Sequence, residues 1–209
     1  CNRAQPVSIP LRKVTDTFLE RCDIAIIGAG AVGLATAFAL SKKFKNVIVF
    51  EKENSFGKHT SSRNSETVHS GIYYPTGTLK AKLCLRGNEL IYRFMKDNDI
   101  THMNCGKYII ASSQDEIPEI EKLLANGIKN NVPGIRIAEG SEIEKREPLV
   151  KAVSGVYVPT AGIMNSYELM KRFETIAKDN GTLFVYRTGV SGIKKPGSGY
   201  IIESDDGYS

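Results

Sequence analysis

Residues 23–51 read DIAIIGAGAVGLATAFALSKKFKNVIVFE, and this stretch decides the fold. An apolar, β-branched run, Cys22–Ile27, is typical of a buried parallel strand. After a glycine-rich turn, small and apolar residues recur at helical spacing from Leu34 to Phe44, and a second apolar run, Val47–Phe50, leads into Glu51. Strand, helix and strand in this order predict one βαβ unit and an α/β fold.

The turn between the first strand and the helix, Gly28-Ala29-Gly30-Ala31-Val32-Gly33, matches the dinucleotide fingerprint GxGxxG. In that fingerprint the first glycine permits a tight turn, the second lets the backbone approach a pyrophosphate, and the third lets the helix pack closely on the sheet. The helix N-terminus then offers unpaired N–H groups and a positive dipole end to the phosphates. The alternative is a glycine turn in an unrelated α/β fold, with Glu51 merely at a strand end.

An acidic residue strengthens the dinucleotide interpretation. Glu51 ends the second strand at about the 20-residue spacing from the first glycine that the fingerprint expects. A carboxylate there accepts hydrogen bonds from a ribose 2′-hydroxyl and repels a 2′-phosphate, which disfavours NADP. The predicted nucleotide-binding residues of this unit are Gly28, Gly30, Ala31, Val32, Gly33, Glu51 and Lys52.

Composition excludes several other classes of protein. The chain has 209 residues, 41% hydrophobic and 24% charged, which are ordinary values for a folded domain, and its net charge of +5 is spread along it. No basic stripe or aromatic platform predicts nucleic-acid binding. The four cysteines show neither a pairing pattern nor metal-ligand spacing, so we expect free thiols and no metal site. No apolar run approaches the roughly 20 residues of a membrane-spanning helix, so any membrane association would have to occur without a spanning helix.

The residues before the first strand carry basic side chains and begin with Cys1 rather than methionine. We interpret residues 1–21 as a leader, either the remnant of a mitochondrial transit peptide or a plain disordered segment. Mitochondrial localisation is therefore one prediction and a cytoplasmic location the alternative.

Further elements are predicted from periodicity and from turn residues. Ser141 and Glu144 suggest a capping box for a short helix ending before Pro148, and Asn165 or Ser166 is expected to cap the last helix. The other predicted helices are 79–97 and 116–131, and the predicted strands are 107–111, 153–158, 183–186, 190–194 and 199–203.

The stretch Thr60–Tyr74, TSSRNSETVHSGIYY, resembles the signature loop of L-2-hydroxyglutarate dehydrogenases and oxidases, a family of D-amino-acid-oxidase-like flavoproteins. The likeness continues through LKAKLC at 79–84, CGK at 105–107, NVPG at 131–134 and PTAGI at 159–163. It departs from the family at Glu66, where many relatives have a small residue, at Thr67, where they have an aliphatic one, and at Asn165, where many carry Asp.

The resemblance implies FAD as the cofactor and a Rossmann-like FAD-binding domain followed by part of an α+β substrate domain. It places 22–110 and 150–209 in the FAD-binding domain and 111–149 in a helical insertion of the substrate domain. Because relatives are much longer, the resemblance also implies that this chain is a fragment, whose second half would complete the flavin site and the substrate pocket.

Roles for individual residues follow from the same resemblance. Thr60, Ser61, Ser62, Arg63 and Asn64 would contact phosphate and ribitol oxygens, although such a loop can also bond to itself.

Four further residues complete the predicted site. The backbone of Val190 would meet the adenine. His69, with an ordinary pKa near 6.5, would take the hydroxyl proton of the substrate or else hold the loop. Tyr73 and Tyr74 would wall the flavin or donate to a substrate carboxylate, unless they only pack.

The function implied is oxidation of L-2-hydroxyglutarate to 2-oxoglutarate, with a 2-hydroxy dicarboxylate as substrate and a quinone-type compound or oxygen as electron acceptor. Alternatives within the same fold are amine, amino-acid and glycerol-3-phosphate oxidoreductases. Outside it are a NAD-binding protein without flavin and an inactive truncated flavoprotein.

Overall fold

The computed structural model describes residues 21–205, so the predicted leader lies outside the described residues except for Arg21. The chain divides into two compact units: residues up to Phe56 together with those from Ile176 onward, and residues Gly57–Thr175. The domain boundaries proposed from the sequence stay a prediction.

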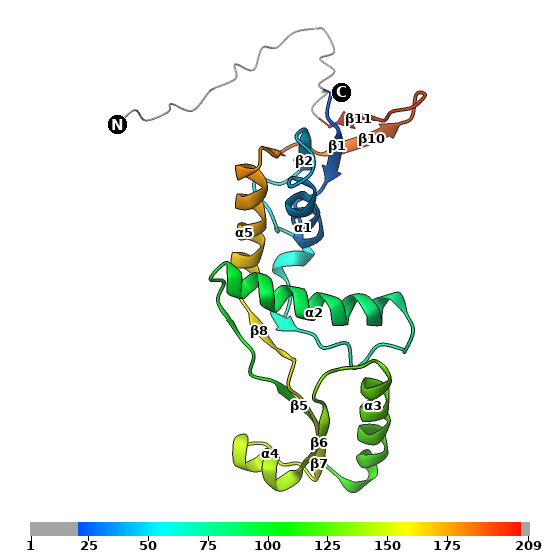
Figure 1. Ribbon diagram of the computed structural model, residues 1–209, viewed down its shortest axis with the longest axis vertical. Coiled ribbons are helices and arrows are strands. Elements are labelled where there is room, and N and C mark those ends of the chain that lie inside the picture. Colours follow the sequence, from blue (N-terminus) through cyan, green and yellow to red (C-terminus); the bar gives the residue numbers. More distant parts are fainter. Residues whose placement is uncertain (1–20, 206–209) are drawn as a thin grey trace, which may run out of the picture. The chain divides into compact units, whose positions relative to one another are not determined.

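The first unit contains the βαβ arrangement. Strands β1 (Ile24–Ile27), β2 (Val47–Glu51) and β9 (Leu183–Tyr186) form a parallel sheet in the order β1-β2-β9. Helix α1 (Ala31–Leu40) connects β1 to β2 and lies against both, as Figure 1 shows. The predicted α/β class and its parallel βαβ unit are confirmed.

The core of this unit contains side chains from helix α1 and from the parallel sheet. Leu34 and Ala37 of α1 and Val47 and Val49 of β2 are almost completely buried. A separate antiparallel hairpin follows β9, made of β10 (Val190–Lys194) and β11 (Ile201–Ser204). It is drawn in orange and red in Figure 1. The hairpin continues directly from the strand that pairs with β2.

The second unit is built on two antiparallel sheets. The larger has the order β5-β7-β6, with β5 at Lys107–Ala111, β7 at Ser154–Val158 and β6 at Arg136–Glu139. The smaller has the order β3-β8-β4, with β3 at Thr67–Val68, β8 at Gly162–Met164 and β4 at His102–Met103.

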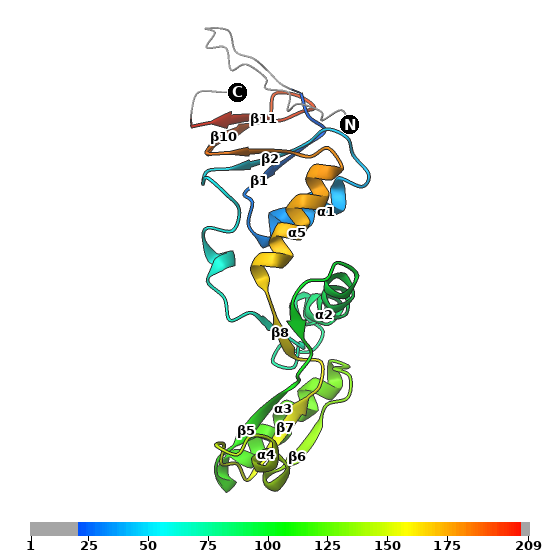
Figure 2. The ribbon, with the colours of Figure 1, turned by 90° about the vertical axis from the view of Figure 1, so that its left-hand side faces the viewer.

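The helices of the second unit differ in length and in the sheet that they contact. The longest is α2 (Leu79–Asp97), while α3 (Ile117–Lys129) and α4 (Gly140–Arg146) accompany the larger sheet (Figure 2). Two 3-10 turns, η1 (Thr60–Ser62) and η2 (Gln114–Glu116), complete the unit, and α5 (Ser166–Asp179) leads along the chain out of it.

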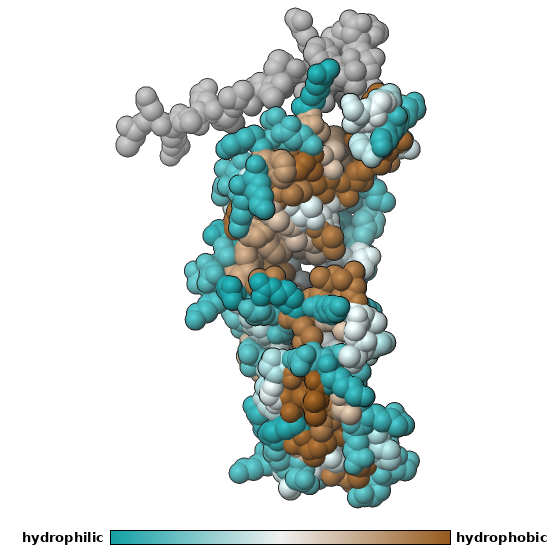
Figure 3. All heavy atoms as spheres, turned by 45° about the vertical axis from the view of Figure 1, so that its right-hand side comes forward, coloured by the Kyte–Doolittle hydropathy of each residue, from teal (hydrophilic) through white to brown (hydrophobic). Residues whose placement is uncertain are grey.

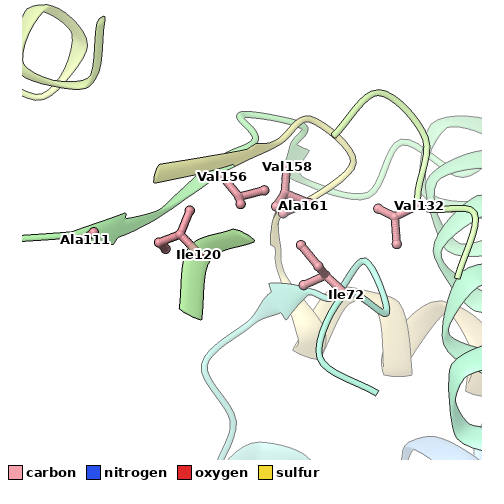
Figure 4. Packing of buried hydrophobic residues seen from close by; sticks show 7 residues of the cluster. All are labelled: Ile72, Ala111, Ile120, Val132, Val156, Val158 and Ala161. Carbon is pink, nitrogen blue, oxygen red and sulfur yellow. The ribbon is translucent and has the colours of Figure 1, made fainter. Parts of the chain in front are cut away.

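The core of the second unit joins the larger sheet, α3 and the turn that follows β3. Ile72 from this turn packs with side chains of β5, β7 and α3 (Figure 4). The fully assembled cluster comprises Ile72, Ala111, Ile120, Val132, Val156, Val158 and Ala161. The turn that carries Tyr73 is therefore anchored in the hydrophobic core rather than lying free on the surface.

Several predicted elements match the structure residue by residue, among them α2 and β5. The predicted capping box of α4 is wrong: Glu139 occupies the N-cap position and no side chain caps the helix. The helix begins at Gly140, two residues earlier than a cap at Ser141 predicts, and only glycine fits at its first position because a Cβ there would overlap the carbonyl oxygen of Ala152. Strands β3, β4, β6 and β8 were not predicted.

Hydrophobic side chains also reach the surface. On the face seen in Figure 3, hydrophobic atoms form brown patches between the hydrophilic teal ones. Val32 is 82% exposed and Ile27 is 51% exposed, both beside the glycine turn of the first unit.

Candidate functional site

The glycine turn gives Gly28 the tight turn and Gly33 the close packing that were predicted for them, whereas the approach of Gly30 to a pyrophosphate stays a prediction. Gly28 has a positive φ of 94°, and its N–H donates to the carbonyl oxygen of Phe50 over 2.7 Å. Gly30 is the N-cap of α1 with extended backbone. A Cβ at Gly33 would overlap the carbonyl oxygen of Gly28, so only glycine lets the first turn of α1 pack on the strand exit.

The N-terminus of α1 is left without a side-chain cap. Gly30 cannot supply one, and the first turn contains no acidic residue. The first N–H groups of a helix have no acceptor inside it, and the helix dipole is positive there. This end of α1 therefore suits a phosphate better than a neutral group.

Glu51 is a buried carboxylate, 8% exposed, at the end of β2. Its Oε2 accepts from the backbone N–H of Ala29 over 2.7 Å, and its Oε1 accepts from that of Glu53 over 3.0 Å. Each carboxylate oxygen has a second lone pair, so the anchored group can still accept hydrogen bonds from ribose hydroxyls. The glycine turn, the uncapped helix and Glu51 together fit the ADP half of a dinucleotide. Lys52 is exposed beside them.

The segment that carries Val190 is hydrogen-bonded to the last residue of β2 and to the residues that follow it. The N–H of Thr188 donates to the carbonyl oxygen of Glu51 over 3.0 Å, and the N–H of Arg187 donates to that of Glu53 over 2.9 Å. Val190 follows at the start of β10, where the pairing with β11 is irregular. The structure thus brings Val190, Glu51 and the glycine turn into one neighbourhood of the first unit.

The Thr60–Asn64 segment forms η1 and bonds extensively within itself. The Ser62 hydroxyl donates to the His59 carbonyl oxygen over 2.9 Å, and the Asn64 amide donates to the Ser61 carbonyl oxygen over 2.9 Å. The side chains of Thr60 and Arg63 are exposed. Contacts of this loop with phosphate or ribitol stay a prediction.

His69 follows β3 and is held through its backbone. Its carbonyl oxygen accepts from the side-chain amide of Asn88 over 3.0 Å, and the same amide also donates to the Thr160 carbonyl oxygen over 2.9 Å. Partial burial and then the positive charge of Lys107 lower the pKa of the imidazole below its ordinary value. The ring is therefore neutral at pH 7, which is the form a general base requires.

Tyr73 and Tyr74 lie on a turn that two asparagines hold. Asn126 donates to the Ile72 carbonyl oxygen over 2.6 Å, and Asn130 donates to the Tyr74 carbonyl oxygen over 2.8 Å. The Tyr74 ring lies 4.5 Å from Lys80 Nζ. The turn therefore presents both tyrosine rings from a rigid backbone.

Lys107 lies beside Tyr73 and His69, and the sequence analysis did not identify it as a site residue. Its Nζ lies 4.6 Å from the centroid of the Tyr73 ring, and its charge acts on His69. A signal was present in the sequence, since a lysine opens the otherwise apolar strand KYIIA. The second unit thus brings together His69, Tyr73 and Lys107.

Other kinds of site find no support in residues 21–205. No group of three His, Cys, Asp or Glu side chains is arranged to hold a metal ion there. Within the same range, none of the helices has the length and apolar character to cross a membrane. Cys22, Cys84 and Cys105 are free thiols.

Fold and glycine turn together define a dinucleotide-binding α/β protein, and comparison with known proteins refines that class. Residues 23–208 match the model of a family described as FAD dependent oxidoreductase. The chain belongs to this family.

Among curated relatives, mitochondrial L-2-hydroxyglutarate dehydrogenase of Arabidopsis thaliana is 42% identical over 170 residues, which cover 78% of this chain and 35% of that protein. The human mitochondrial L-2-hydroxyglutarate dehydrogenase is 36% identical over 174 residues, 82% of this chain and 38% of that protein. An Escherichia coli L-2-hydroxyglutarate dehydrogenase is 32% identical over 191 residues, 88% of this chain and 44% of that protein. The chain therefore spans between about a third and a half of the length of these relatives.

Among solved structures, dithionite-reduced L-alpha-glycerophosphate oxidase from Mycoplasma pneumoniae, with FAD bound, matches with a TM-score of 0.82 and 26% identity. The match covers 90% of this chain and 50% of that one. Glycine oxidase from Geobacillus kaustophilus matches with a TM-score of 0.79 at 21% identity, which shows the shared fold alone. FAD is thus the cofactor of the family, and the residues of the glycine turn fit its ADP half.

Proposed function

We propose that the protein oxidises L-2-hydroxyglutarate to 2-oxoglutarate with FAD as the oxidant. The observation that carries this proposal is the His69–Tyr73–Lys107 group, which combines a neutral imidazole with a half-buried cation. An α-hydroxy acid needs a base for its hydroxyl proton and a cation for its carboxylate, and this group offers both. The similarity to L-2-hydroxyglutarate dehydrogenases in plants, animals and bacteria supports the choice of substrate.

The chemistry divides between cofactor and chain. FAD supplies a two-electron acceptor for the hydride that leaves the hydroxyl-bearing carbon. The imidazole of His69 takes the hydroxyl proton, so that a carbonyl forms at that carbon. The glycine turn and the first turn of α1 would hold the pyrophosphate, and Glu51 would accept from the adenosine ribose.

Partners and location follow from the same proposal. Electrons would pass from the flavin to a quinone-type compound or to oxygen. A mitochondrial location is proposed because relatives in Arabidopsis thaliana and Homo sapiens carry that designation, whereas the bacterial relatives do not.

The test uses protein expressed from the complete reading frame that contains these residues, purified with FAD and kept anaerobic. We expect L-2-hydroxyglutarate to bleach the flavin absorbance, whereas glycine, L-proline and glycerol 3-phosphate leave it unchanged. His69→Asn should slow the bleaching by about 100- to 10,000-fold, the usual contribution of a general base. His102→Asn is the matched control, because His102 lies on β4 with its Nδ1 already 2.7 Å from the Ile100 carbonyl oxygen.

A second candidate, oxidation of glycerol 3-phosphate, is favoured by the likeness to L-alpha-glycerophosphate oxidase. Bleaching by glycerol 3-phosphate and not by the hydroxy acid would replace the first proposal with this one. Bleaching by an amino acid alone would reject both.

A further inference from the structure

Lys107 is the half-buried first residue of β5. In a strand, alternate side chains share a face, so Lys107 lies on the same face of β5 as Ile109 and Ala111. Ala111 belongs to the buried cluster around Ile72, and Ile109 packs against that cluster. Tyr108, on the opposite face, instead pairs with Tyr157 and donates to Glu142.

The backbone before Lys107 is fixed tightly. Gly106 has a positive φ of 71°, and its N–H donates to the Ala161 carbonyl oxygen over 2.9 Å. A Cβ at Gly106 would lie 2.6 Å from the Tyr157 hydroxyl, so a larger residue would displace that ring. The direction in which Lys107 leaves the backbone is therefore set by its neighbours on both sides.

A cation on a core-facing position normally requires an anionic partner. Within residues 21–205 no carboxylate forms an ion pair with Lys107, and its ammonium lies instead over the Tyr73 ring. Burial accordingly lowers the pKa of this lysine from its ordinary value. The Lys107 ammonium is thus a partly desolvated cation that has no carboxylate counter-ion within residues 21–205.

Groups near Lys107 are neutral rather than anionic. Burial raises the pKa of the Cys84 thiol, even though Lys107 and Lys80 oppose that effect, and burial also raises the pKa of the Tyr73 phenol. Both are therefore protonated at pH 7, and His69 is neutral.

We propose that Lys107 is the residue that binds a carboxylate of the substrate, with the Tyr73 ring holding the ammonium in place beside His69. This inference rests on the proposed function, because it identifies the cation that a hydroxy dicarboxylate requires. The carboxylate of the substrate would supply the missing counter-ion, and the partial burial of Lys107 makes this ion pair stronger than one in open water. Lys80 is less suited to this role because its side chain is exposed.

The test is calorimetric titration of the FAD-containing protein, from the complete reading frame, with glutarate. Glutarate has both carboxylates but no hydroxyl to oxidise, so binding is measured apart from turnover. We expect Lys107→Met to weaken glutarate binding by about 10- to 100-fold, the usual effect of removing one charged hydrogen-bond partner. Lys82→Met, which removes an exposed lysine of α2, should leave the affinity unchanged.

Stability measurements separate this role from a structural one. Lys107→Met removes a partly buried charge that lacks a counter-ion, so the melting temperature should stay equal or rise. If that variant does not fold, Lys107→Arg provides the measurement, because it keeps the charge and should keep glutarate affinity within a few-fold. KM for the hydroxy acid should rise in Lys107→Met far more than kcat falls.

The outcomes distinguish this inference from the proposed function. Glutarate binding that is absent from the parent protein, or unchanged by Lys107→Met, overturns the role of Lys107 even if L-2-hydroxyglutarate bleaches the flavin. Glutarate binding that depends on Lys107 supports that role even if the flavin is not bleached, in which case only the hydroxy-acid reaction is rejected.

Discussion

The backbone N–H of Ala29 donates to Oε2 of Glu51 over 2.7 Å, which ties the glycine turn to the end of the neighbouring strand. The other oxygen, Oε1, accepts from Glu53 N–H over 3.0 Å. The residue predicted to bind ribose is therefore also a structural anchor of the turn that is predicted to bind the pyrophosphate. One carboxylate fixes the position of the turn and is also the predicted acceptor for the sugar.

Replacing Glu51 with glutamine tests this double role. Glutamine has one acceptor oxygen for two backbone donors, and its amide turns a donor toward one of them. We expect the free energy of unfolding to fall by about 1–3 kcal/mol, the cost of an unpaired buried polar group. We also expect weaker binding of ADP, measured by calorimetry. Glu121→Gln, at an exposed carboxylate of α3, should change neither; equal loss in both variants would contradict the anchor role.

Two glycines on helices provide a matched pair for a second prediction. A Cβ at Gly33 would overlap the Gly28 carbonyl oxygen, whereas one at Gly87, in the middle of α2, meets no atom within 4 Å. Gly33→Ala should destabilise the protein by about 1–3 kcal/mol because backbone must move. Gly87→Ala should stabilise it by about 0.5–1 kcal/mol because alanine favours the helix.

Urea unfolding measures both changes, and FAD content on purification reports the binding site. Gly33→Ala should be purified with little flavin, and Gly87→Ala with the parent amount. If Gly33→Ala stabilised the protein as Gly87→Ala is expected to, the close packing of Gly33 on the Gly28 carbonyl oxygen would not be required for folding.

Sequence patterns predicted the parts of the site that depend on neighbours along the chain. The glycine turn and Glu51 lie within one βαβ unit, so their spacing along the chain was enough to predict a nucleotide site, and α2 was predicted to the residue from its periodicity. Lys107 was missed because its role depends on packing against a turn from another part of the chain. The short strands β3 and β8 were missed because two or three residues carry no period.

The turn that carries Tyr73 yields a third prediction. Asn130, 4% exposed, donates to the carbonyl oxygens of Gly71 and Tyr74, and Asn126 donates to those of Ile72 and Tyr74. Asn130→Ala should lower the free energy of unfolding by about 1–3 kcal/mol, because it leaves buried carbonyls without a donor. Asn126→Ala should have a smaller effect, because that side chain is less buried.

The double variant tests whether the two asparagines act as one clamp. Because both donate to Tyr74, the effects of Asn126→Ala and Asn130→Ala should deviate from additivity by about 0.5–3 kcal/mol in urea unfolding. Simple additivity would mean that the two side chains hold the turn independently.

The N-terminus of α5 is bound by the side chain of a residue far away in the sequence, and this contact leads to the last prediction. Glu66 Oε1 accepts from the backbone N–H of Ser166 over 2.9 Å and from its hydroxyl over 2.8 Å, while Asn165 Oδ1 accepts from Glu168 N–H. A negative charge at the start of α5 therefore comes from a residue 100 positions away, in addition to the charge of Glu168 in the first turn of the helix.

Hydrogen bonds from the backbone and then from the hydroxyl of Ser166 lower the pKa of Glu66 from its ordinary value of 4.5. A carboxyl whose pKa is lower when folded contributes stability that is fully present above the unfolded pKa and is lost as pH falls through the folded pKa. Glu66→Gln should therefore lower the urea midpoint at pH 7, and the difference from the parent should disappear at a pH below the folded pKa. Adding Asn165→Asp should restore part of the loss at pH 7, because the charge returns to the same helix end. A difference that persists unchanged in acid would show that Glu66 stabilises α5 by shape rather than by charge.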